Sequence, residues 1–80
     1  MPVGNYVMVV KDYGRIELKL KALMDGRNIT RNYLARHINA RFEVVDKWYN
    51  GDVEKLDLDI LARICFVLKC NVEDVITYTE

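Results

Sequence analysis

The sequence predicts an all-α, five-helix domain, with a short β-strand favoured near its N-terminus. Two observations carry this prediction. Apolar residues recur at helical spacing in several short segments, and glycine, asparagine or helix-capping residues separate these segments. Because a chain of 80 residues can close only one core, we expect one domain at residues 15–80, preceded by an N-terminal arm or strand at residues 1–14.

The strand signal lies in residues 6–10, Tyr-Val-Met-Val-Val, which are β-branched or aromatic and are flanked by turn formers. Residues 74–80 have a similar character, so the two ends are candidates for pairing within the chain or across a dimer. A terminal segment that finds no such partner frays.

The first two helices are predicted by apolar spacing and by their caps. Ile16, Leu20, Leu23 and Met24 follow the i, i+4, i+7, i+8 spacing of an amphipathic helix, which Gly26 ends as a C′ glycine. Thr30 is a good N-cap for a second short helix. The inward stripe of that helix is Leu34, Ala35 and Ile38.

The remaining helices follow tight turns. Asn39 ends the second helix, because asparagine tolerates the left-handed conformation, and residues 42–49 form the third helix with Val45 and Trp48 inward. Gly51 ends it. The fourth helix is the most apolar, with Leu58, Leu61, Ala62, Ile64, Cys65 and Leu68. Asn71 and Asp74 resemble a capping arrangement for a short fifth helix that carries Val75 and Ile76 onto the core.

Composition and charge restrict the function classes. The chain is 51% hydrophobic and 30% charged, and it has no apolar run of the roughly 20 residues that a membrane span needs. Its start has no basic region typical of a signal peptide, and its two cysteines are not spaced as a CxxC site, so we expect a cytoplasmic protein. The formal net charge is zero, but residues 15–51 carry +4 and residues 52–80 carry −4. Such a dipolar domain can turn its positive half toward phosphate.

Residues 34–51, LARHINARFEVVDKWYNG, place two helices around a tight turn, and this geometry lets one helix enter a DNA major groove while the other crosses the backbone. The segment resembles the helix-turn-helix of the lambda-repressor and Cro-like family, also called the Xre family. The positions on the family pattern are Leu34, Ala35, Ile38, Ala40, Val45, Trp48 and Gly51. The later segment LDLDILARICFVLKCNVEDVITY is similar to a small single-domain subgroup of the family. The resemblance implies a lambda-repressor-like helix-turn-helix fold that binds double-stranded DNA.

The resemblance also assigns candidate DNA-binding residues. Phosphate contacts fall on Arg31 and on the turn around Asn50, and the third helix offers its outward side chains to the bases. The candidates are Arg31, Arg41, Phe42, Glu43, Asp46, Lys47 and Asn50. The chain departs from the pattern at Arg41, where Ser or Thr is usual, and at two acids, Glu43 and Asp46. Acids beside phosphate weaken binding unless each meets a donor such as a cytosine amino group.

The sequence therefore predicts a sequence-specific DNA-binding transcriptional regulator of the repressor type that reads the major groove with the helix at residues 42–49. Regulators of this geometry usually form homodimers. The alternative is a protein-interaction module, such as an antitoxin-like or mobile-element accessory protein, whose Phe42 and Val44 bind a protein partner. We expect no enzyme, cofactor or metal, because His37, Cys65 and Cys70 are scattered and no catalytic group of residues stands at a matching spacing.

Overall fold

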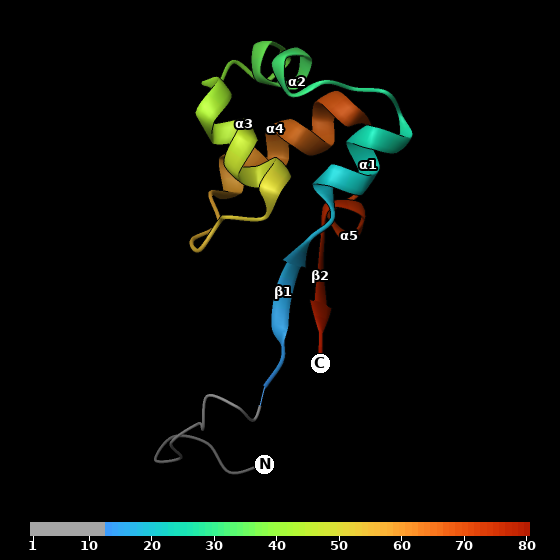
Figure 1. Ribbon diagram of the computed structural model, residues 1–80, viewed down its shortest axis with the longest axis vertical. Helices are drawn as coiled ribbons and strands as arrows, with labels where there is room; N and C mark the ends of the chain where they lie inside the picture. The colour runs from blue at the N-terminus through green and yellow to red at the C-terminus, as the bar shows by residue number, and fades with distance from the viewer. Residues whose placement is uncertain (1–12) are drawn as a thin grey trace.

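A computed structural model describes residues 13–80, and the strand predicted at residues 6–10 lies outside these residues. Five helices gather at one end of the molecule and a two-stranded ribbon extends from them (Figure 1). The helices are α1 (Leu20–Gly26), α2 (Arg31–His37), α3 (Phe42–Asn50), α4 (Leu58–Leu68) and α5 (Val72–Val75). The predicted five-helix, predominantly helical architecture is confirmed.

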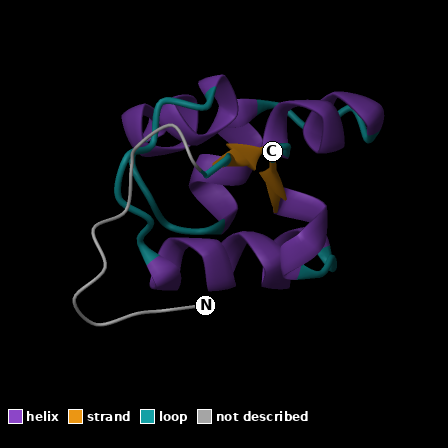
Figure 2. Ribbon diagram, turned by 90° about the horizontal axis from the view of Figure 1, so that it is seen from below, coloured by secondary structure: helices purple, strands orange, loops and turns teal. Residues whose placement is uncertain are grey.

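The ribbon joins segments from opposite ends of the described chain. Strand β1 (Arg15–Leu18) pairs antiparallel with β2 (Ile76–Thr79), so that Ile16 lies opposite Tyr78. Viewed from below, the ribbon is seen nearly end-on in front of the helices, with the C-terminus at its tip (Figure 2). The C-terminal segment, for which the sequence predicts strand pairing, thus pairs within the chain. Its partner in the described part of the chain is residues 15–18.

The predicted start of the first helix at Ile16 is wrong. Ile16 lies in β1, its side chain is 59% exposed, and α1 begins at Leu20. The i, i+4 spacing of Ile16 and Leu20 is satisfied equally by a strand that leads into a helix. Pairing with a segment about 60 residues away decides between the two, because β2 supplies hydrogen-bond partners that the local sequence does not reveal.

The core is one cluster of apolar side chains to which all five helices contribute. Its members are Leu20, Met24, Leu34, Ala35, Ile38, Val45, Trp48, Ile60, Leu61, Ile64, Leu68 and Val75. Full burial of one large apolar side chain stabilises the fold by about 1.5 to 3 kcal/mol before the entropy of ordering is subtracted. The predicted inward positions of α2 and α3 are confirmed.

In α4 the buried stripe is Ile60, Leu61, Ile64 and Leu68. Leu58 and Ala62, two of the six residues that make this segment apolar, are exposed, with Leu58 at 71%. The wide apolar surface of this segment left the rotation of the helix undetermined, and packing selects the stripe that contains Ile60. Cys70 lies beyond the helix end, where its N–H donates to the Cys65 carbonyl at 3.1 Å, and both thiols are free.

Left-handed residues mark the helix ends. Asn39 (φ 56°) and Gly51 (φ 79°) end α2 and α3 as the sequence predicts. Gly26, however, is the last helical residue of α1, and the left-handed position falls two residues later at Asn28 (φ 57°). Asparagine thus takes the left-handed conformation after both α1 and α2, which the side-chain amide permits at lower cost than other non-glycine residues.

The two glycines at helix ends should respond in opposite directions to alanine. Gly51→Ala forces a Cβ into a left-handed conformation and should lower the free energy of unfolding by about 1 kcal/mol. Gly26→Ala meets no atom within 4 Å in an ordinary helical conformation and should raise the free energy of unfolding by up to about 1 kcal/mol. Urea unfolding followed by circular dichroism measures both. An equal loss of stability in the two variants would contradict the assignment of left-handed strain to Gly51.

Candidate nucleic-acid interface

The turn between α2 and α3 is positioned by backbone, core and side-chain contacts. Thr30 caps α2 by accepting a hydrogen bond from the Tyr33 N–H at 3.0 Å, as predicted. After the left-handed Asn39, the Ala40 N–H donates to the Ala35 carbonyl at 2.9 Å. Ile38, at the end of α2, is buried in the core. The buried Ile38 and the backbone hydrogen bond of Ala40 together fix the direction in which the chain leaves the turn and enters α3.

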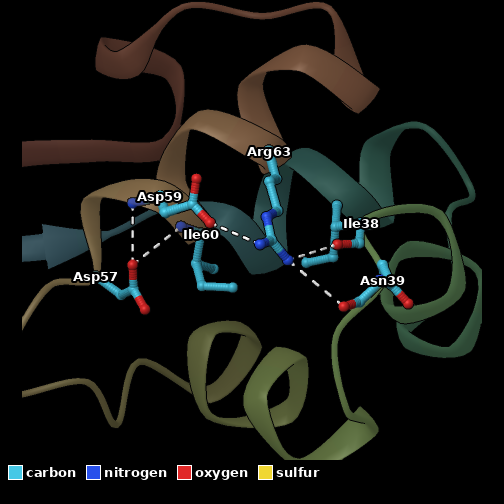
Figure 3. A network of polar contacts seen from close by, with 6 residues as sticks. All are labelled: Ile38, Asn39, Asp57, Asp59, Ile60 and Arg63. Atoms are coloured by element: carbon cyan, nitrogen blue, oxygen red, sulfur yellow. Dashed lines mark hydrogen bonds and ion pairs between the residues drawn. The ribbon is translucent and has the colours of Figure 1, made fainter.

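Arg63 of α4 adds a contact to this turn that the sequence analysis did not identify (Figure 3). One guanidinium nitrogen donates to the Ile38 carbonyl at 3.1 Å and lies 3.5 Å from the Asn39 carbonyl. The other forms an ion pair with Asp59 at 2.7 Å. A planar fork of donors suits this role, because it can hold the orphan carbonyls of a helix end and a carboxylate at the same time.

Two faces of α3 lie outside the core. The residues of each face follow one another at helical spacing. Val45 and Trp48 are buried. Glu43, Lys47 and Asn50, at i, i+4 and i+7, are exposed and define the outward face of α3. Phe42, Asp46 and Tyr49 have the same spacing one position earlier, and they define the face that is turned toward α2 and α1, where their contacts lie.

The second of these faces surrounds Arg31, the first residue of α2. The Arg31 guanidinium forms an ion pair with Asp46 at 2.6 Å, and both side chains are partly exposed, at 41% and 36%. Its Cζ atom lies 4.8 Å from the centre of the Tyr49 ring and 5.6 Å from that of the Phe42 ring. Two aromatic rings and a carboxylate therefore hold the guanidinium in place.

Tyr49 extends this arrangement to α1. Its hydroxyl donates to Asp25 at 2.6 Å, and Lys21 pairs with the same carboxylate at 3.2 Å. The hydrogen bond from Tyr49 is the main cause that holds the pKa of Asp25 below its ordinary value, and the contact raises the pKa of Tyr49 in turn. The Asp25 hydrogen bond likewise raises the pKa of Lys21. A shallow hollow of about 520 Å³ borders the group, with Asp25, Arg31, Phe42 and Tyr49 in its wall.

The predicted site residues thus divide into two groups. The structure brings Arg31, Phe42 and Asp46 into contact. It leaves Glu43, Lys47 and Asn50 on the outward face, with Arg41 exposed at the N-cap of α3, where its side chain makes no capping bond. Tyr49, Asp25 and Lys21 were missed, although the spacing of Tyr49 from Asp46 and Phe42 could have placed it beside them.

Other candidates have ordinary roles. Trp48 is 3% exposed and anchors the core, as predicted. His37 is exposed and stacks on Tyr33 with ring centres 3.8 Å apart. Within residues 13–80 no group of three potential metal-ligating side chains comes together, and no helix is long and apolar enough to cross a membrane.

A helix-turn-helix that packs on a core through one side, and whose second helix exposes a polar face, is the architecture of a DNA-binding module. The chain belongs to the family of Cro/C1-type HTH DNA-binding domains, which residues 19–80 match. This membership confirms the family resemblance of residues 34–51. No match was found among curated proteins.

A solved structure is similar in fold. It is the crystal structure of a protein from Bacteroides fragilis described as a "putative DNA-binding protein". The TM-score is 0.70 at 16% sequence identity, and the alignment covers 79% of this chain and all of that one. At this identity the similarity establishes the shared fold.

The contact between Tyr49 and Asp25 makes a prediction about pH. Tyr49→Phe removes the donor and should raise the pKa of Asp25 toward its ordinary value near 3.8, which NMR titration of the carboxyl carbon measures. Because the folded-state pKa of Asp25 is lowered, its contribution to stability is present above the unfolded pKa and is lost as pH falls through the folded pKa. The stability difference between wild type and Tyr49→Phe should therefore shrink below about pH 4. If the pKa of Asp25 were the same in Tyr49→Phe and in wild type, the hydrogen bond from Tyr49 would not be the cause of the lowered pKa.

Proposed function

We propose that the protein is a sequence-specific transcriptional regulator of the repressor type that reads the major groove of double-stranded DNA with α3. The observation that carries this proposal is the outward face of α3. In a Cro/C1-type domain, this helix buries Val45 and Trp48 and turns Glu43, Lys47 and Asn50 to solvent. Ammonium and amide groups bind base edges and phosphates, and a carboxylate accepts hydrogen bonds from the amino groups of bases.

Arg31 is the proposed phosphate contact of α2. The ion pair with Asp46 uses one guanidinium nitrogen, and an arginine side chain has five N–H donors in a planar fork. The remaining donors of a side chain that is 41% exposed are sufficient for a phosphate oxygen. Arg31 can therefore keep Asp46 and bind phosphate at the same time, and the pairing removes one of the two acids as an obstacle to DNA.

Arg41, Lys47 and Asn50 complete the proposed interface. Arg41 and Lys47 lie at the N-terminus and in the last turn of α3, within reach of phosphate or guanine. Phe42, one of the candidate DNA-binding residues, has its ring against Arg31 and is 40% exposed. We assign Phe42 mainly to the support of Arg31.

A homodimer is part of the proposal. Two copies that dock α3 in successive major grooves on one side of DNA would lie about 34 Å apart, which predicts a near-palindromic operator. Cytoplasmic localisation accompanies this function.

The alternative of a protein-interaction module relied on Phe42 and Val44 as one apolar face. The structure separates them, because Val44 packs on the core while Phe42 contacts Arg31.

Selection from a random-sequence duplex pool, followed by fluorescence anisotropy at two salt concentrations, tests the function. We expect enrichment of a near-palindrome whose affinity falls steeply with salt, because phosphate contacts release counterions. Sedimentation analysis of the protein on the enriched duplex should give two chains per duplex. A pool that shows no enrichment would contradict sequence-specific binding, and one chain per duplex would contradict the dimer.

The phosphate role of Arg31 is tested by substitution. Arg31→Ala should weaken binding to all duplexes and reduce the slope of log K against log salt by about one. Arg31→Ala alone leaves the Asp46 carboxylate without its partner, and this carboxylate would repel phosphate. The double variant Arg31→Ala with Asp46→Asn removes that charge, so it measures the loss of the phosphate contact alone. Arg15→Ala is the matched control, because it removes the same charge from β1, at the opposite end of the molecule from α2 (Figure 1). Equal slopes for Arg31→Ala and wild type would refute the contact.

A further inference from the structure

The two acids of α3 have different surroundings. The Asp46 carboxylate is occupied by Arg31 at 2.6 Å and lies on the face that is turned toward α2. The Glu43 carboxylate is exposed on the outward face, and within residues 13–80 no hydrogen bond or ion pair engages it, although Lys47 is one helical turn away. From the sequence, Glu43 and Asp46 were both acids that oppose DNA binding. In the fold, Asp46 is paired with Arg31 and Glu43 is exposed.

A free carboxylate in a DNA interface has few favourable partners. An ionised carboxylate only accepts hydrogen bonds, and phosphates repel it. In the major groove the donors are the amino groups of cytosine and adenine. Adenine carries the acceptor N7 beside its amino group, which repels the second carboxylate oxygen, whereas cytosine presents its N4 amino group without that neighbour. Glutamate is therefore matched to cytosine.

We propose that Glu43 determines base specificity by accepting a hydrogen bond from the N4 amino group of a cytosine, and that Asp46 reads no base but positions Arg31. This inference rests on the DNA-binding function proposed above. Glu43 is the second residue of α3, and the N-terminal residues of a recognition helix are the ones that reach base edges. Asp46 lies one turn further along and is already bound.

Both roles predict distinct effects of isosteric substitutions. Glu43→Gln keeps the size of the side chain and replaces a pure acceptor with an amide, which pairs with the N6 and N7 atoms of adenine. Asp46→Asn keeps the shape of the Arg31 partner and removes its charge. The first change should alter which base is selected, and the second should alter affinity for all duplexes by a common factor.

The experiment is selection from the random duplex pool with wild type, Glu43→Gln, Glu43→Ala and Asp46→Asn. Wild type should enrich cytosine at one fixed position in each half-site. Glu43→Gln should switch that position to adenine with a change in relative affinity of about tenfold or more, and Glu43→Ala should lose the preference there. Asp46→Asn should enrich the wild-type bases. Thermal melting of the Glu43 variants should match wild type, because this side chain is exposed and has no partner in the described structure.

The outcomes separate this inference from the function on which it rests. A wild-type protein that enriches an operator, together with a Glu43→Gln variant that enriches the same bases, would overturn the role of Glu43 and leave the function standing. A base switch in Asp46→Asn would overturn the positioning role of Asp46. A wild-type protein that binds no duplex would overturn the function and this inference together.

Discussion

The rotation of α3 about its own axis is the constraint on which the rest of the interface depends. Burial of Val45 and Trp48 fixes that rotation. A helix has about 3.6 residues per turn, so anchoring two positions on one side determines the direction of every other side chain. The outward face and the face around Arg31 both follow from this anchoring. A rotation of one residue, about 100°, would exchange exposed and buried positions and lose the burial energy of the tryptophan.

Polar contacts between side chains and the backbone further restrict the orientation of α2 and α3 that the core sets. Arg63 holds the carbonyls of the turn before α3, and the pair of Arg31 with Asp46 links α2 to α3 beyond the turn. The ion pairs of Arg31 with Asp46 and of Arg63 with Asp59 are both partly exposed, so each contributes modestly to stability, in the range of about 0 to 1 kcal/mol. Their effect is geometric, because they restrict how α2 and α3 move relative to each other and to the scaffold.

Local sequence signals predicted most of the helical unit, because its determinants are short-range. Thr30, Asn39 and Gly51 act on the residues next to them, and the stripes of α2 and α3 follow from spacing alone. The start of α1 was predicted incorrectly, the rotation of α4 was left undetermined, and the pairing of residues 15–18 with β2 was not foreseen. Ile16 fits a helix or a strand locally, and only a distant segment decides between them. Leu58 is apolar yet exposed, because α4 has more apolar surface than the core can cover.

The ribbon of β1 and β2 joins residues about 60 positions apart, whereas neighbouring elements make the contacts of the helix-turn-helix. Closing so long a loop costs more entropy than forming a helical turn. The ribbon is therefore the part of the fold that we expect to assemble late and to open first, while α2 and α3 keep their relative orientation. Opening of the ribbon is in this way confined to one end of the molecule, away from the helices that present the interface.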